Sequence, residues 1–369
     1  MNAIIVSKAL VVGEYQRKLE AMAAYQDLKL VCVVPPSWKT EVGELRLETS
    51  HTRGYRLAVQ PIRFNGNFHL FHFPTLGRLF RTLRPDLVHV DEEPYNLSTF
   101  LAIRDARAAG AKTVCFTWQN LLRRYPPPFS LMEQWVYRSV DAVIAGTEEA
   151  AQVLRQKGYR GRLEVIPQFG IDPDRFSPGA PRPGPPWSIG FVGRLVEQKG
   201  LMTLLLAAAR LADDWRLELI GAGPFRTDLE ARALALGVRE RLVFRDQVPS
   251  GAVPEALRGL HVLVLPSETR TFWKEQFGRI LVEAMACGVP VIGSDSGEIP
   301  RVIGNAGLVT PEGDVEALAA TLTRVLMDAR LRADLAGRGR ARVLEHFTHA
   351  RIAERTVGLY RDTLSLSAS

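Results

Sequence analysis

At 369 residues the chain exceeds the ~250–300 residues at which one hydrophobic core stops growing, so we expect two domains. Apolar residues make up 46% and charged residues 24%, as in globular proteins, and no stretch reaches the ~18 apolar residues of a membrane-spanning helix. The net charge of +7 lies mainly in the N-terminal half, and three scattered cysteines indicate neither a disulfide framework nor a zinc site. Lys8 interrupts the first apolar run, so we expect no signal peptide and a cytoplasmic protein.

The first half of the chain alternates short apolar runs with segments of helical period. We expect helices near residues 14–25 and 97–109, and strands at 3–7, 28–34, 86–90, 113–116, 142–145 and 163–166. Such alternation predicts a parallel sheet covered by helices on both faces. We assign residues 1–170 to this N-terminal domain.

The segment 53–84 combines arginines with aromatic residues and contains no acidic residue. Its arginines are Arg53, Arg56, Arg63, Arg78, Arg81 and Arg84. A basic surface of this kind suits nucleic acid, anionic lipid head groups or an anionic acceptor, and the alternative is a solvated arginine face over a buried aromatic core. We expect no nucleic-acid partner and hypothesise a peripheral contact with an anionic membrane at its cytoplasmic face.

Residues 171–187 are rich in proline and glycine, so we interpret them as a linker. The alternating pattern then restarts, with strands expected at 188–192, 216–220, 242–244, 262–266 and 289–293, and helices at 200–211, 225–236, 253–258 and 277–287. The fold class predicted is therefore α/β, with two doubly wound, Rossmann-like domains facing a central cleft. The second domain spans 188–345. A polar segment of helical period runs from 315 to 364 and overlaps the end of this domain.

The loop after the strand 188–192 reads Gly193-Arg194-Leu-Val-Glu-Gln-Lys199-Gly200 and places two cations where such a domain binds its ligand. An arginine grips phosphate oxygens bidentately and a lysine adds a compact charge, so the pair suits a leaving diphosphate. A solvated loop with unrelated charges is the alternative.

The strand 262–266 leads to Glu275-Gln-Phe277-Gly278, which opens a helix that contains Glu283. A helix N-terminus with a glycine lets a ligand approach the backbone, and carboxylates accept hydrogen bonds from sugar hydroxyls. Alternatively, Glu275 only complements the helix dipole and Arg279 pairs only with Glu283. A glycosidase with two catalytic carboxylates is a weaker interpretation, because nothing fixes their separation.

These motifs, with Leu-Ile-Gly221-Ala-Gly223-Pro and the Glu-x7-Glu spacing from 275 to 283, resemble glycosyltransferase family 4, whose members are retaining enzymes of the GT-B fold. The resemblance implies that Arg194, Lys199 and Glu275 are catalytic. It implies donor binding by a further set, Gly193, Gly221, Gly223, Val248, Phe277, Gly278 and Glu283. It also implies a C-terminal helix, 346–369, that crosses back to the first domain, and catalysis in which the leaving phosphate accepts the acceptor's proton without a metal or other cofactor.

The N-terminal half departs from the family pattern, because Thr117-Trp118-Gln119-Asn120 stands where many members carry a histidine. Candidate acceptor residues in this half are Gly13, Tyr15, His89, Glu92, Gln119 and Asn120. The acidic runs 91–93 and 172–174 mimic metal ligands, but we expect no metal site. The first follows a strand where it can meet the acceptor, and the second lies in the expected linker.

We therefore expect a hexosyltransferase that takes its sugar from a nucleotide diphosphate donor. Its acceptor would be a glycan, a lipid or a small molecule, and its role would lie in glycan biosynthesis. One alternative is a sugar-nucleotide epimerase or a phosphorylase of the same fold. The other is a catalytically silent subunit that binds a nucleotide sugar, which the missing histidine makes conceivable.

Overall fold

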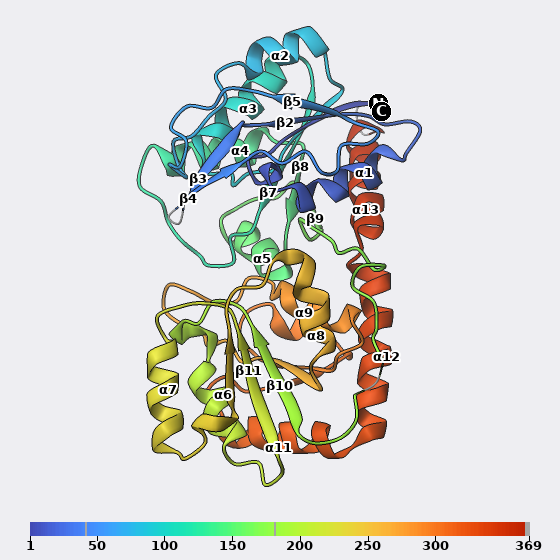
Figure 1. The fold of residues 1–369 in the computed structure, drawn as a ribbon. Coiled ribbons are helices and arrows are strands. Elements are labelled where there is room, and N and C mark those ends of the chain that lie inside the picture. The colour runs from blue at the N-terminus through green and yellow to red at the C-terminus, as the bar shows by residue number, and fades with distance from the viewer. Residues whose placement is uncertain (41–42, 181, 366–369) are drawn as a thin grey trace. The chain divides into compact units, whose positions relative to one another are not determined.

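The computed structural model describes residues 1–40, 43–180 and 182–365 and divides the chain into two compact units (Figure 1). Unit 1 comprises Met1–Gly170 together with the segment from His349 onward, and unit 2 comprises Ile171–Thr348. Each unit is built on its own parallel sheet, so the fold class expected from the sequence is confirmed. Within the described ranges, no helix has both the length and the apolar character needed to cross a membrane.

Unit 1 contains a seven-stranded parallel sheet in the order β5-β2-β1-β6-β7-β8-β9. Its strands are β1 (Asn2–Val6), β2 (Lys29–Val34), β5 (Arg56–Val59), β6 (Leu87–Val90), β7 (Lys112–Thr117), β8 (Ala142–Ala145) and β9 (Arg162–Val165). The strand order reverses between β1 and β6, and ligands of such sheets bind beyond the carboxyl ends at this reversal. A separate antiparallel pair, β3 (Ser37–Thr40) and β4 (Gly43–Arg46), was not expected from the sequence.

Helices cover both faces of the unit 1 sheet. They are α1 (Arg17–Ala23), α2 (Leu76–Leu83), α3 (Leu97–Ala108), α4 (Phe129–Ser139), α5 (Glu148–Gln156) and α13 (His349–Ser365). Because successive strand side chains point to opposite faces, Ile4 and Val6 join the core with α2 to α5, while Ala3 and Ile5 join the core with α1 and α13. The helix expected at 14–25 is instead a 3₁₀ turn, Gly13–Gln16, followed by α1.

The chain's last helix, α13, completes one core of unit 1, and Figure 1 shows it in red beside α1. His89 at the end of β6 is completely buried, and its Nδ1 lies 2.7 Å from the Tyr360 hydroxyl of α13. Burial lowers the pKa of His89 to about 4, so the ring is neutral. The structure therefore contradicts the prediction that His89 is an acceptor residue, because α13 covers it.

Unit 2 contains a six-stranded parallel sheet in the order β12-β11-β10-β13-β14-β15, which reverses between β10 and β13. The strands are β10 (Trp187–Val192), β11 (Trp215–Ile220), β12 (Leu242–Arg245), β13 (Val262–Leu265), β14 (Val291–Ser294) and β15 (Leu308–Thr310). The helices are α6 (Leu201–Ala208), α7 (Arg226–Ala235), α8 (Val253–Arg258), α9 (Arg279–Ala286), α10 (Ile299–Ile303), α11 (Val315–Met327) and α12 (Ala329–His346). The tail expected as one helical region is thus divided into α11, α12 and α13.

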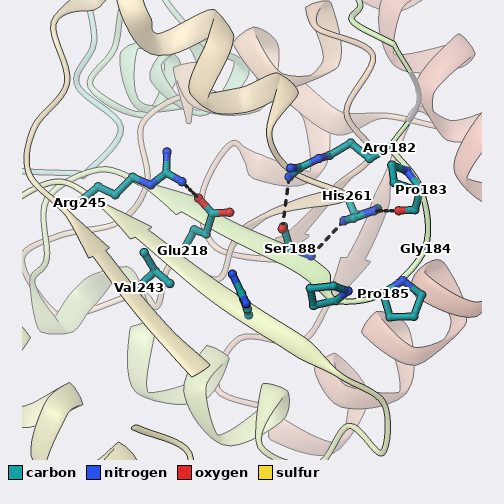
Figure 2. Close-up of a pocket in the computed structure, with 11 residues that line it drawn as sticks. Arg182, Pro183, Gly184, Pro185, Ser188, Glu218, Val243, Arg245 and His261 are labelled. Atoms are coloured by element: carbon teal, nitrogen blue, oxygen red, sulfur yellow. Dashed lines mark hydrogen bonds and ion pairs between the residues drawn. The ribbon is translucent and has the colours of Figure 1, made fainter. Parts of the chain in front are cut away.

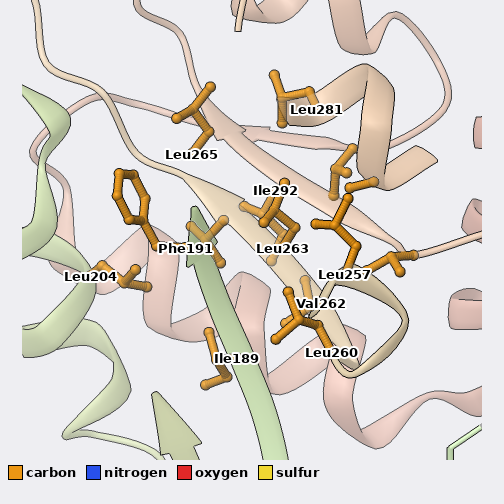
Figure 3. Packing of buried hydrophobic residues seen from close by; sticks show 14 of the residues in the cluster. Ile189, Phe191, Leu204, Leu257, Leu260, Val262, Leu263, Leu265, Leu281 and Ile292 are labelled. Carbon is orange, nitrogen blue, oxygen red and sulfur yellow. The ribbon is translucent and has the colours of Figure 1, made fainter. Parts of the chain in front are cut away.

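The two central strands of unit 2, β10 and β13, are mostly apolar because most of both their faces is covered by other elements. All four residues of β13 are buried. Figure 3 shows Val262, Leu263 and Leu265 of this strand packed with Leu281 of α9 and with Leu257 and Leu260, which precede the strand. Gly190 of β10 is required by this packing, since a β-carbon there would lie 2.1 Å from Cδ1 of Leu260. The close packing fixes the strands whose carboxyl ends carry the predicted motifs.

The predicted linker, 171–187, is not a separate connection. Ile171 and Phe176 are buried in the core of unit 2. The Arg340 guanidinium of α12 donates hydrogen bonds to the carbonyl oxygens of Phe176, at 2.5 Å, and Pro173, at 2.9 Å. Two buried apolar side chains and one half-buried arginine therefore attach this proline-rich segment to unit 2, whose boundaries are 171 and 348 rather than 188 and 345.

Candidate functional site

The candidate donor site lies at the carboxyl edge of the unit 2 sheet. All six strands are parallel, so the loops after β10, β11, β12 and β13 meet at one edge. These loops contain nearly all the donor-site residues predicted from the sequence, and Glu283 follows in the second turn of α9. The loops after β10 and β13 flank the reversal of strand order, where such sheets bind their ligands.

Lys199 and Glu275 form an ion pair at this reversal. The Lys199 Nζ, on the 3₁₀ turn Glu197–Lys199, lies 2.5 Å from Oε2 of Glu275, and the side chains are 18% and 10% exposed. The Ser267 hydroxyl donates to the same oxygen at 2.8 Å, and the Trp273 ring centroid lies 5.0 Å from the ammonium. The sequence predicted that Lys199 contacts the phosphates and Glu275 contacts the sugar. In the structure the two side chains also form an ion pair with each other.

Ser267 and the loop after β14 were not recognised from the sequence. Ser267 is completely buried, and its carbonyl oxygen accepts a hydrogen bond of 2.5 Å from the Ser294 hydroxyl. A β-carbon on Gly297, whose φ is +58°, would lie 2.0 Å from the Glu275 carbonyl oxygen. The segment Ser-Asp-Ser-Gly after a strand was the available signal, because it supplies hydroxyls and a left-handed turn at the ligand-binding edge.

The glycines after β11 allow two loops to pack backbone against backbone. A β-carbon on Gly221 would lie 2.0 Å from the Gly193 carbonyl oxygen, and one on Gly223 would lie 2.1 Å from that of Leu195. The Leu195 amide donates to the Ala222 carbonyl at 2.9 Å, and Leu195 is completely buried. These contacts hold the loop that carries Arg194, so Gly193, Gly221 and Gly223 have a structural role besides any contact with a donor.

Arg194 is exposed, and within the ranges that the structure describes its guanidinium makes no hydrogen bond or ion pair. A cation held on an anchored loop without a partner is available to an anionic ligand. Val248, in the loop after β12, is half-buried at the same edge.

The helix α9 begins at Arg279, two residues later than expected, with Gly278 as its left-handed N-cap at φ 74°. The Arg279 Nε lies 2.8 Å from Oε1 of Glu283, so the pair considered in the sequence analysis is formed. Phe277 is half-buried and its ring packs edge-on against Phe347, with 5.8 Å between centroids. A donor that uses Glu283 must therefore share it with Arg279.

At the strand reversal of unit 1, Lys8 and Glu92 form a buried ion pair, with side chains 12% and 2% exposed. The Lys8 amide also donates to Oε1 of Glu92 at 2.7 Å. The Lys8 ammonium lies 4.7 Å from the ring centroids of both Phe68 and Phe71. Burial raises the pKa of Glu92, and Lys8 opposes that shift.

The other acceptor candidates after β7 also have partners within the protein. The Gln119 side-chain oxygen accepts a hydrogen bond from Lys157 at 2.9 Å, and its amide donates to the Tyr125 hydroxyl at 3.2 Å. The Asn120 amide donates to Oε2 of Glu149 at 3.3 Å. Both side chains are buried, so an acceptor would meet a polar network that is already ordered.

Gly13 and Tyr15 lie in the loop and 3₁₀ turn after β1. The Gly13 amide donates to Oε2 of Glu48 at 2.6 Å, and a β-carbon on Gly13 would lie 2.8 Å from the Ser50 hydroxyl. Tyr15 stacks on Phe169, with 4.1 Å between ring centroids. Gly13 is therefore buried by local packing, while Tyr15 remains partly accessible.

Sequence reasoning missed an aromatic cluster at the same edge of unit 1. It consists of Phe68, His69, Tyr95, Tyr125 and Phe129, which follow β5, β6 and β7. Tyr95 and Tyr125 stack at 4.1 Å, and the His69 ring lies 5.0 to 5.9 Å from the other four rings. These rings are separated by up to 61 positions in the chain, so no local pattern could have grouped them.

Glu93 should make the stability of unit 1 depend on pH. Burial raises its pKa to about 7, although the Thr117 hydroxyl and the Trp118 amide donate to it at 2.6 and 2.7 Å. The folded protein thus holds this proton more tightly than the unfolded chain, so the contribution of Glu93 to stability is fully present below pH 4.5 and is lost as pH rises through about 7. In Glu93→Gln we expect the loss of stability between low and high pH to be smaller by about 2 kcal/mol. The full pKa shift would give a larger difference, but the side chain is partly exposed to solvent, which reduces it.

Chemical denaturation of the wild type and Glu93→Gln at pH 5, 6, 7 and 8 measures the difference. The two stability curves should converge toward pH 4.5, separate as the pH rises from there to about 7, and stay a constant distance apart above it. Parallel curves would show that Glu93 titrates alike in the folded and unfolded chain.

Two family models match the chain. "Glycosyl transferases group 1" matches residues 174–342, and "Glycosyltransferase Family 4" matches residues 27–175. The 2-deoxystreptamine glucosyltransferase of Streptomyces kanamyceticus is 34% identical over 55% of this chain and 55% of its own. The GDP-mannose-dependent alpha-(1-6)-phosphatidylinositol monomannoside mannosyltransferase of Mycolicibacterium smegmatis is 32% identical over 53% of this chain and 56% of its own. The matched region thus spans about half the length of these curated relatives.

Solved structures share the fold. Sucrose-phosphate synthase from Thermosynechococcus elongatus superposes with a TM-score of 0.72 and 19% identity over 100% of both chains. The HepE protein of Anabaena in complex with UDP superposes with a TM-score of 0.73 and 17% identity over 98% of this chain and 99% of its own.

Proposed function

The chain belongs to the family 4 glycosyltransferases, and we propose that it transfers a hexose-type sugar from a nucleotide diphosphate donor to an acceptor, with retention of configuration. The observation that carries this proposal is the Lys199–Glu275 pair at the strand reversal of unit 2, 2.5 Å between charged atoms. An accessible Arg194 lies on the same loop as Lys199. Two cations and one ordered carboxylate at a ligand-binding edge suit a diphosphate joined to a sugar.

In the proposed reaction, Arg194 and Lys199 hold the diphosphate and stabilise the charge that develops when the sugar C1–O bond breaks. Glu275 and the backbone at Phe277–Gly278 orient the sugar, and Glu283 accepts from the ribose. The acceptor oxygen bonds to C1 on the face that the diphosphate leaves, and its proton passes to the departing phosphate oxygen. The chain then needs no general base in the Gln119–Asn120 loop, and no metal enters the proposal.

A thermal-shift panel of UDP-, GDP-, ADP- and dTDP-sugars tests the donor site, because a ligand of the native state raises its unfolding midpoint. One nucleotide series should stabilise the wild type and lose most of its effect in Glu283→Ala. Glu316→Ala, which removes an exposed carboxylate of α11 in the same unit, is the matched control and should respond like the wild type. A panel without any shift, or a shift unchanged in Glu283→Ala, would contradict the site.

The rival functions differ in their products. An epimerase would release an altered sugar nucleotide or free nucleotide without an acceptor product, and a silent subunit would bind the donor without turnover. Activity that is unchanged by a chelator would support the metal-independent reaction. The first step is therefore product analysis with the donor that the thermal-shift panel identifies.

We place the acceptor at the aromatic cluster and the Lys8–Glu92 pair of unit 1. Aromatic faces stack on the apolar faces of sugar and cyclitol rings, and the polar network beneath them offers donors and acceptors to hydroxyls. Relatives named for 2-deoxystreptamine and for phosphatidylinositol mannoside support a cyclitol-containing acceptor. In Tyr125→Ala we expect the rate no longer to saturate with acceptor concentration, while donor binding is unchanged. This result would distinguish the acceptor site from the donor site.

A lipid acceptor would bring unit 1 to a membrane, and the segment 53–84 is suited to that contact. Its six arginines are all exposed, and Phe64 and Phe68 are exposed beside them, 59% and 42% accessible. We expect the protein to float with vesicles that contain anionic lipid, and Arg78→Glu/Arg81→Glu on α2 to weaken flotation by roughly tenfold. Arg210→Glu in unit 2 is the control, and flotation that is absent or unaffected by the α2 variant would contradict this contact.

A further inference from the structure

A hollow of about 330 Å³ lies on the face of the unit 2 sheet opposite the α6 side, at β10, β11 and β12 (Figure 2). Leu217 and Leu219 of β11 point into the core. The alternate residues, Arg216 and Glu218, therefore point to the other face and line the hollow. The segment 182–186, which leads into β10, forms its opposite wall.

Positive charge predominates around the hollow. Arg182, Arg216 and Arg245 line it, and Glu218 is the one carboxylate among its described lining residues. Glu218 pairs with Arg245 at 2.9 Å, and Arg182 donates to the Ser188 hydroxyl at 3.3 Å. Among the described residues, the Arg216 side chain has no hydrogen bond or ion pair. Three guanidinium groups and a single carboxylate give the hollow a net positive charge, which attracts anions.

His261 fixes the wall of the hollow without adding charge. The Ser188 amide donates to its Nδ1 at 3.0 Å, so that nitrogen carries no proton, and its Nε2 therefore donates to the Pro183 carbonyl oxygen at 2.6 Å. Figure 2 shows His261 between these two partners. Burial lowers the pKa of His261, consistent with the neutral ring. The imidazole ties the segment that carries Arg182 to the start of β10, so that guanidinium is held at the rim.

We propose that this hollow binds a small phosphate-bearing anion. A guanidinium group presents paired N–H donors that match phosphate oxygens, and no other residue in the described part of the chain accepts from the Arg216 guanidinium. The volume exceeds that of roughly ten waters, so it admits a diphosphate or a phosphate with a small organic group. The competing interpretation is that these arginines only keep the edge strand β12 from pairing with another chain.

The hollow is separate from the candidate donor site. Ser188, Arg216 and Val243 are each the second residue of their strand, and of the other lining residues only Arg245 stands at the end of a strand, where the donor loops begin. From Ser188 to Gly193 is five residues, or ~16 Å along an extended strand. An anion held between Arg216 and Arg182 would therefore lie apart from the phosphates that Arg194 and Lys199 would hold, and the proposal does not depend on the proposed function.

Pyrophosphate titrations followed by thermal shift, at constant ionic strength, test the site. They are made in the wild type and in the Lys199→Met variant, which removes one of the two donor-loop cations and so weakens binding there. We expect a saturable shift that Arg216→Gln weakens roughly tenfold, because one charge-assisted contact is lost. Arg216 is exposed, so this variant should fold, and Arg210→Gln in the same unit is the matched control.

Three outcomes would overturn the proposal. A shift that is present in the wild type and absent in Lys199→Met would place the anion only at the donor loops. Equal weakening by Arg216→Gln and Arg210→Gln would indicate non-specific charge. No shift up to about 10 mM pyrophosphate would show that the hollow does not bind this anion with a Kd in the millimolar range or below.

Discussion

Lys199→Met is expected to lower kcat by roughly 10²- to 10³-fold, because it removes a cation from the developing charge of the leaving diphosphate. The thioether fills a similar volume without a charge. The Glu275 carboxylate keeps its hydrogen bond from Ser267, so it stays placed at 2.8 Å from that hydroxyl but loses its counter-ion. We expect the KM for the donor to change less than kcat, since the charge is greatest in the transition state.

Steady-state kinetics on the wild type, Lys199→Met and Glu275→Gln measure this effect. Arg226→Met removes an exposed cation that pairs with Glu230 on α7 of the same unit, so its kcat should match the wild type. The double variant Lys199→Met/Glu275→Gln should recover stability but not activity, because the unpaired charge is gone while the catalytic cation is still missing. A kcat within threefold of the wild type in Lys199→Met would remove Lys199 from the reaction.

Lys8→Met is expected to have the largest effect on stability, about 3 kcal/mol at pH 8, because it leaves the Glu92 carboxylate buried without its cation. Methionine can still pack against the rings of Phe68 and Phe71. Burial already raises the pKa of Glu92, and loss of Lys8 should raise it further. Protonation then relieves the cost, so the variant should be nearer to the wild type at pH 5 than at pH 8.

Chemical denaturation at the two pH values measures this difference. Lys8→Met/Glu92→Gln removes the charge together with its partner and should regain most of the lost stability. Arg351→Met breaks an exposed pair on α13 and should change stability by less than about 0.5 kcal/mol. A pH-independent loss in Lys8→Met would assign its effect to packing rather than to the unpaired carboxylate.

The local pattern of the sequence was sufficient for the regular elements with buried faces. The run at 262–266 is continuously apolar and the run at 188–192 is apolar after Ser188, because most of both faces of these strands is covered, and the structure has β10 and β13 there. The segments without such a pattern were missed, as β3 and β4 show, since both lie on the surface of unit 1. The linker was misjudged because composition did not reveal that Ile171 and Phe176 are buried.

The sequence by itself determined the two α/β domains and the loops that carry the donor-site residues, because helix and strand periodicity and motif spacing are local properties. Only the tertiary structure decided which of those residues meet. Lys199 reaches Glu275 across 76 positions, Lys8 reaches Glu92 across 84, and His89 reaches Tyr360 across 271. Such pairs depend on the order of strands in the sheet and on how far packing buries the charged groups. Neither property can be predicted from the residues that are adjacent in the sequence.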